Sequence, residues 1–85
     1  MKITVIVRAF NDYQGNAVGF SYIGKTKEEA ISKFVDSIWD WWIGFVEYDE
    51  NKTHEEIMNI YKEMYLGEEY ITIEDVVVWF TWPTS

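Results

Sequence analysis

The sequence has no cysteine, one proline and one histidine among its 85 residues. Without cysteine there is no disulfide framework and no thiolate chemistry, which indicates a reducing compartment. The longest clear apolar run, residues 41–46, is far too short to span a bilayer. No stretch has the length and flanks of a targeting segment. We therefore expect a single domain over residues 1–85 that acts in the cytoplasm and does not bind membranes.

Residues suited to catalysis are also scarce. The single histidine, His54, stands among acids where a helix is expected to start, so we predict an exposed side chain there rather than a catalytic base. Residues 49–55 alternate oxygen-bearing side chains as a calcium loop does, but His54 takes the glycine position and Ile60 that of the bidentate glutamate. The glycines are too scattered for a phosphate-binding loop. We predict no enzyme activity, no catalytic residue, no metal site and no cofactor.

Basic residues are few as well. Seven lysines and arginines stand against fifteen acids, which gives a net charge of −8, and the bases do not cluster, so direct binding to nucleic acid is disfavoured. The whole net charge falls within residues 26–69, where twelve acids accompany four bases. Such a field attracts basic surfaces. The alternative is that the acidity only keeps an aromatic-rich protein soluble.

The stretch over residues 26–46 predicts the central helix of the domain. Thr26 followed by Glu29 is a capping box, the usual signature of a helix start. Gly44 predicts that the helix ends or bends there. Trp39 and Trp41 fall on the borders of the apolar face, where a tryptophan either seals the core edge or anchors a partner. At 100° per residue the apolar face consists of Ile31, Phe34, Val35, Ile38, Trp42 and Phe45.

The remaining chain predicts three strands and a second helix. β-Branched and apolar residues indicate strands over 2–10 and 17–24, joined by a turn. A second capping box, Thr53 with Glu56, starts a shorter helix that Gly67 follows. The last strand, 68–81, is either continuous or broken at residues 74–75. The apolar stripe of the second helix consists of Ile57, Ile60, Tyr61 and Met64.

The order of these elements predicts an α+β fold. It reads ββααβ, and the simplest packing is a three-stranded antiparallel sheet with both helices on one face. Neither face of the first strand is cleanly polar. We therefore expect this strand in the centre of the sheet, with the last strand beside it.

The combination of acids and aromatics predicts a surface that binds a protein partner. Carboxylates at helical spacing can imitate rows of phosphates and occupy an arginine- and lysine-lined channel of a nucleic-acid-processing protein. Exposed aromatic rings, Tyr65 and Tyr70 among them, can supply the apolar anchors of such an interface. The predicted partner-binding residues are Asp36, Asp40, Glu47, Asp49, Glu50, Glu55, Glu56, Glu63, Glu68, Glu69, Trp39 and Tyr48.

Two resemblances bear on function. A β-hairpin, then GKTKEEAISKF, then acids and aromatics, is similar in size, charge and layout to small phage-encoded anti-defence inhibitors such as anti-CRISPR proteins. Several of these mimic nucleic acid. The resemblance implies an inhibitor of a basic, nucleic-acid-handling defence protein, acting in the cytoplasm of a host cell.

Residues 1–38 also resemble the N-terminal part of HicB-type antitoxins. The chain keeps several positions of that family's G-x-x-x-x-G-x-T-x-E-E-A-like run, but it lacks the family's third strand before the helix and its basic DNA-binding tail. This resemblance implies the alternative function, an antitoxin-like or homodimeric structural interaction domain that pairs through its aromatic surface. The matching positions are Gly24, Thr26, Glu28, Glu29 and Ala30.

Overall fold

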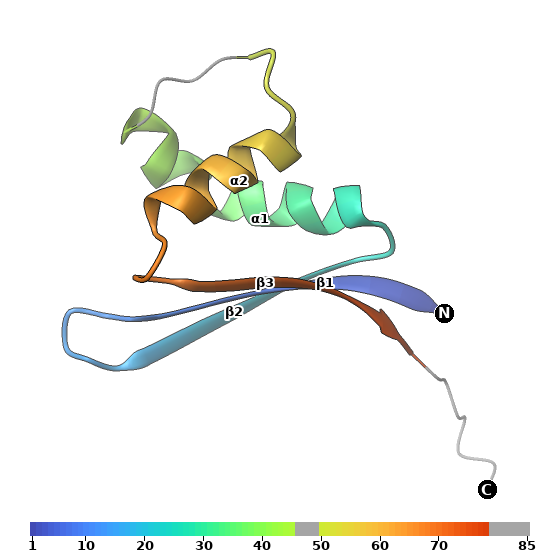
Figure 1. Cartoon of the computed structure of the whole chain (residues 1–85), viewed down its shortest axis with the longest axis horizontal. Helices are drawn as coiled ribbons and strands as arrows, with labels where there is room; N and C mark the ends of the chain where they lie inside the picture. Colours follow the sequence, from blue (N-terminus) through green and yellow to red (C-terminus); the bar gives the residue numbers. More distant parts are fainter. Residues whose placement is uncertain (46–49, 79–85) are drawn as a thin grey trace, which may run out of the picture.

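The computed structural model describes residues 1–45 and 50–78, and it shows the expected α+β fold in the order ββααβ (Figure 1). The helix α1 (Lys27–Trp42) is followed by a 3-10 helix, η1 (Ile43–Phe45), so the α-helix ends just before Gly44, as predicted. The main elements are β1 (Lys2–Asn11), β2 (Ala17–Gly24), α1 (Lys27–Trp42), α2 (His54–Met64) and β3 (Tyr70–Val77).

The three strands form an antiparallel sheet in the order β2-β1-β3. The central position predicted for β1 is confirmed. β3 pairs continuously with β1 through Glu74 and Asp75, so the last strand is not broken there. The part of that predicted strand beyond residue 78 lies outside the described residues.

Each strand turns alternate side chains to the two faces of the sheet. Thr4, Ile6 and Arg8 of β1 are buried on the face that the helices cover. Both helices lie on that side, and neither lies on the opposite side (Figure 1). This confirms the predicted arrangement of two helices on one face.

Both helices begin at the predicted threonines. The Thr26 hydroxyl accepts a hydrogen bond from the Glu29 amide at 3.2 Å, and the Thr53 hydroxyl accepts one from the Glu56 amide at 3.2 Å. The Glu29 carboxylate in turn accepts from the Lys25 amide at 3.0 Å. These bonds satisfy amides that have no partner within the helix, and so fix where each helix starts.

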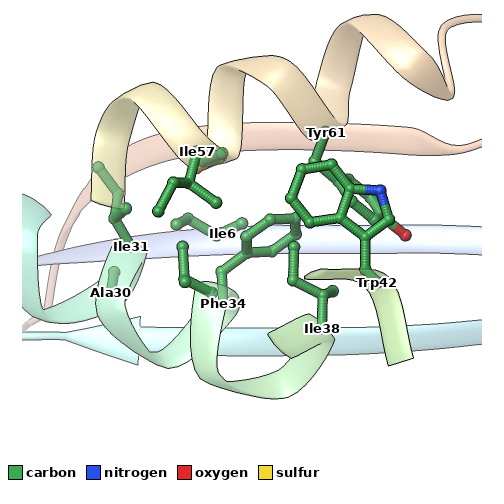
Figure 2. Close-up of a cluster of buried hydrophobic side chains, with 10 residues drawn as sticks. Ile6, Ala30, Ile31, Phe34, Ile38, Trp42, Ile57 and Tyr61 are labelled. Atoms are coloured by element: carbon green, nitrogen blue, oxygen red, sulfur yellow. The ribbon is translucent and has the colours of Figure 1, made fainter. Parts of the chain in front are cut away.

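The core lies between α1, α2 and the centre of β1 (Figure 2). The Tyr61 ring meets Phe34 and Trp42 edge to face, with centroids 5.4 and 5.2 Å apart, an arrangement that stabilises aromatic pairs beyond their buried area. The predicted face of α1 is confirmed from Ile31 to Trp42, while the Phe45 side chain lies outside the described part. The buried hydrophobic residues are Ile6, Ala30, Ile31, Phe34, Val35, Ile38, Trp42, Ile57, Met58 and Tyr61.

The stripe predicted for α2 is partly wrong. Ile57 and Tyr61 are buried, but Ile60 is only half-buried and Met64 is 48% exposed. Met58 is buried instead. The buried side of α2 is centred near Tyr61, between Ile57 and Met58. At 100° per residue it is rotated by about 60° from the side that apolar spacing alone favours.

Candidate protein-binding surface

The unpaired carboxylates of the protein gather on the helical layer, by which we mean α1, α2 and their flanking residues. The described ranges hold thirteen acids, of which four form ion pairs. Of the other nine, Asp12 lies in the hairpin turn and Glu74 on β3. The remaining seven are exposed members of the helical layer: Glu28, Asp36, Asp40, Glu50, Glu56, Glu63 and Glu68.

These carboxylates recur at helical spacing. Asp36 and Asp40 are one turn apart on α1, with a rise of about 6 Å between them, and Glu56 and Glu63 are two turns apart on α2. Each pair lies on a side of its helix that is turned away from the core. Glu28 was not among the predicted residues, because an acid in the first turn also suits the helix dipole.

Glu55 is exposed as predicted but is not unpaired. Its carboxylate accepts a hydrogen bond from Lys27 Nζ at 3.0 Å, and both side chains are about half exposed. This hydrogen bond is the first cause of the raised pKa of Lys27. The pair links the start of α1 to the start of α2 and removes part of the charge that Glu55 offers to a partner.

Glu69 is a predicted partner-binding acid that does not lie on the surface. It is placed inside the protein, where its carboxylate accepts from Arg8 Nε at 2.7 Å and from the Tyr61 hydroxyl at 2.9 Å. The Arg8 and Glu69 side chains are only 8% and 9% exposed. Burial works against the charge of Arg8, but the hydrogen bond to Glu69 helps to hold its pKa above the ordinary value. Glu69 is therefore an internal counter-ion and not a displayed acid.

Trp39 is half-buried and packs against the core, as expected of a tryptophan that seals the core edge. Its role in binding a partner stays a prediction. Among the other aromatic candidates, Tyr65 is half-buried and Tyr70 is 64% exposed. Trp41, on the other border of the apolar face of α1, is 42% exposed. Glu47, Tyr48 and Asp49 lie outside the described residues.

An aromatic cleft of about 400 Å³ opens between the hairpin turn and the C-terminal ends of the two helices. At its base the Arg8 guanidinium lies 4.7 Å from the centroid of the Phe10 ring and 5.6 Å from that of Trp41. The lining contains three carboxylates, those of Asp12, Glu68 and Glu69, and one guanidinium, so its net charge is negative. The cleft is lined by Arg8, Phe10, Asn11, Asp12, Tyr13, Trp41, Tyr65, Glu68 and Glu69.

The chemistry of this cleft suits a cationic side chain from another protein. The Phe10 and Trp41 rings already face the Arg8 guanidinium, but Tyr65 has no such cation over its ring among the described residues. An aromatic face attracts guanidinium and ammonium groups, and a carboxylate at the rim adds charge-assisted hydrogen bonds. Glu68 is at the rim and also belongs to the helical layer. The cleft and the acidic helices therefore favour the same class of ligand.

A serine–histidine contact is the feature that sequence reasoning missed. Ser32 Oγ lies 2.9 Å from His54 Nδ1, beside a cavity of about 450 Å³ between α1 and the start of α2. His54 is exposed, as predicted. Among the described residues no carboxylate is hydrogen-bonded to its ring, so the contact lacks the orienting group of a catalytic triad. It joins the two helices.

Within residues 1–45 and 50–78, no group of three or more histidine or acidic side chains could hold a metal ion. In the same part of the chain no helix has the length and hydrophobicity needed to cross a membrane. The sequence matches no protein-family model and no curated protein, and the structure matches no solved structure. The surface of the protein is therefore the feature that bears on its function.

Proposed function

We propose that this protein is an acidic interaction module that inhibits a basic, nucleic-acid-handling defence protein in the cytoplasm of a host cell, as anti-CRISPR inhibitors do. The observation that carries the proposal is the position of the unpaired carboxylates. Seven of the nine in the described chain lie on the helical layer, among them Asp36, Asp40 and Glu63. A nucleic-acid channel presents the arginines and lysines that such a surface pairs with.

The mechanism is competition for that channel. Long-range attraction between the acidic helices and the basic channel speeds the encounter. Carboxylates then replace phosphates as the partners of guanidinium groups, and a basic side chain of the partner enters the aromatic cleft beside Trp41 and Tyr65. Aromatic side chains in such clefts supply much of the binding free energy of an interface. Nucleic acid is excluded because the channel is already filled.

The test is capture followed by competition. The full chain is immobilised and exposed to host-cell lysate at about 50 mM NaCl, a salt concentration at which charged surfaces still attract each other over tens of ångströms. Captured proteins are purified and their binding to DNA or RNA is measured with and without the inhibitor. We expect loss of nucleic-acid binding, and release of the inhibitor at about 500 mM NaCl.

A matched pair of variants separates the acidic surface from net charge. Glu63→Gln removes one carboxylate from α2, and Glu74→Gln removes one from β3; both residues are exposed and neither is in an ion pair. We expect Glu63→Gln to weaken the complex by about two- to fivefold and Glu74→Gln to leave it unchanged. A partner that still binds its nucleic acid while holding the inhibitor would overturn the proposal.

A further inference from the structure

The side of the sheet opposite the helices carries an apolar surface, which we call the open face. The pairing of β1 with β2 places Val5 opposite Ile23, and the pairing with β3 places Ile3 opposite Val76. Because side chains alternate along a strand, these residues point away from the helices. The open face consists mainly of Ile3, Val5, Val7, Ile23, Tyr70 and Val76.

This surface is exposed and almost uncharged. Ile23, Val76 and Tyr70 are 48%, 37% and 64% exposed. Glu74, on the edge strand β3, is the one charged residue that the register of the three strands places on this face. The register also places two uncharged polar residues on this face, Ser21 and Thr72, both opposite Val7. The other end of the face is apolar and consists of Ile3, Val5, Ile23 and Val76. An exposed apolar group of this kind is typical of an interaction site.

We propose that a second copy of this chain covers the open face, so that two sheets pack face to face in a homodimer. The low charge of the open face favours a second copy as its partner, because two nearly neutral, apolar surfaces can pack together without electrostatic repulsion. The helical layers, which hold most of the unpaired acids, then point outward on opposite sides of the dimer. Two packed sheets lie about 10 Å apart, and the two helical layers are farther apart still, so salt screens their repulsion.

The size of the open face fits a weak dimer. Three strands about 4.8 Å apart and about eight residues long give each copy a projected area on the order of 400 Å². The side chains make the accessible area larger, so two copies bury on the order of 1,000 Å², near the lower limit for a specific interface. Glu74 sits on an edge strand, where its carboxylate can stay in water at the rim.

Pairing through a sheet edge is less favoured. The outer edge of β2 is partly occupied, since Lys33 Nζ donates a hydrogen bond to the Ile23 carbonyl at 2.6 Å. Lys33 belongs to α1, and covering the edge of a sheet with a helix is one of the devices that block edge-to-edge pairing. The structure therefore favours the face over the edge.

Sedimentation velocity over a wide concentration range tests the dimer. We expect the mass to rise from 10.2 kDa at low concentration to twice that value at high concentration, with a dissociation constant in the range of roughly 1–100 μM. Because the interface is apolar, association should persist or strengthen at about 1 M NaCl. A monomer up to about 1 mM, or a dimer that salt dissociates, overturns the proposal.

Adjacent valines provide the matched control. Val76 and Val77 are neighbours on β3, both exposed, and their side chains point to opposite faces. We expect Val76→Glu to weaken association at least tenfold and Val77→Glu, which faces Lys2 across the strands, to change it less than twofold. Ile23→Glu on β2 should act as Val76→Glu does.

Circular dichroism confirms that each variant is folded. Dilution of the ¹⁵N-labelled wild-type chain gives a readout without mutation. We expect amide shifts to change in all three strands and not on the outward sides of the helices. A dimer that survives both Val76→Glu and Ile23→Glu uses another surface, and that result also overturns the proposal.

Discussion

Arg8 is a buried guanidinium on the covered face of β1, and its charge requires a partner inside the protein. Glu69 supplies that partner, and the Tyr61 hydroxyl donates to the same carboxylate. Removing one member of a buried pair leaves the other charge uncompensated, which is more costly than losing a surface contact. The stability of the fold therefore depends on Glu69 far more than on the acids displayed around it.

Adjacent residues test this difference. Glu69→Gln should lower the free energy of unfolding by about 3–5 kcal/mol, because the charge of Arg8 stays buried without its counter-ion. Glu68→Gln changes an exposed carboxylate next to it and should alter the free energy by less than about 0.5 kcal/mol. Urea unfolding followed by tryptophan fluorescence measures both. Equal values for the two variants would mean that Glu69 is not buried against Arg8.

Tyr61 gives the fold a dependence on alkaline pH. Burial and the hydrogen bond to Glu69 raise its pKa above the ordinary value of 10.0. Above that pH the unfolded chain loses the tyrosine proton while the folded protein keeps it, so the free energy of unfolding should fall as pH rises. Below the ordinary pKa this contribution is fully present.

In the Tyr61→Phe variant the free energy of unfolding should therefore fall less steeply between pH 10 and about 11.5. At neutral pH this variant should be less stable than the wild type, because Glu69 loses a hydrogen-bond donor. Urea unfolding at several pH values measures the slope. Tyr70→Phe, which removes the hydroxyl of an exposed tyrosine, controls for the substitution itself. A slope identical in wild type and Tyr61→Phe would show that the hydroxyl is not protected in the folded state.

At the scale of elements, β2 and α1 are joined by a close backbone approach at Gly24. A Cβ atom there would lie 2.8 Å from the Thr26 carbonyl oxygen and 2.9 Å from Glu29 Cβ, both in the cap of α1. Since these atoms belong to the start of a helix, they cannot move away cheaply. Glycine at this position lets the strand turn directly into the capping box.

Gly24→Ala should destabilise the fold by about 1–3 kcal/mol, as overpacking against fixed atoms does. Gly19→Ala, on the same strand, meets nothing within 4 Å and should be neutral or slightly stabilising. Thermal unfolding of both variants measures the difference. If Gly24→Ala proved as stable as Gly19→Ala, the close packing of β2 against the helix cap would be wrong.

The elements were predictable because their signals are local. Thr26 and Thr53 mark the helix starts through side chains only three residues from their donors. The central position of β1 followed from its apolar character on both faces. Met58 was missed because the side of α2 that is buried depends on where α1 lies, and the spacing of four apolar residues does not contain that information.

The candidate site was less predictable because its contacts join distant parts of the chain. Arg8 and Glu69 are 61 residues apart, and Ser32 and His54 are 22 apart. No local pattern distinguishes Glu69, which is buried, from Glu68, which is exposed. The exposure of most acids could be predicted, because they stand at solvent-facing helical positions and helical periodicity indicates which positions face solvent.

At the scale of the whole molecule, the two sides differ in chemistry. Among the residues that the structure describes, the helical layer carries seven unpaired carboxylates, and Glu74 is the one charged residue of the open face. Lys2 and Arg8 of β1 are engaged with Asp75 and Glu69. One side therefore attracts cations over long range, while the other can bury apolar area. A dimer through the open face would present two acidic surfaces to basic partners.

If the acidic helical layer binds basic protein surfaces, it should bind a decaarginine peptide, and titration of the ¹⁵N-labelled chain with that peptide measures the binding. We expect amide shifts at Asp36, Asp40 and Glu63 and also around the rim of the aromatic cleft. We expect little change at Ile3, Val5 and Val76 of the open face. Raising NaCl from about 50 to about 500 mM should weaken binding steeply. Glu63→Gln should reduce affinity while Glu74→Gln does not. Shifts spread evenly over helices and sheet, or affinity indifferent to salt, would contradict the account.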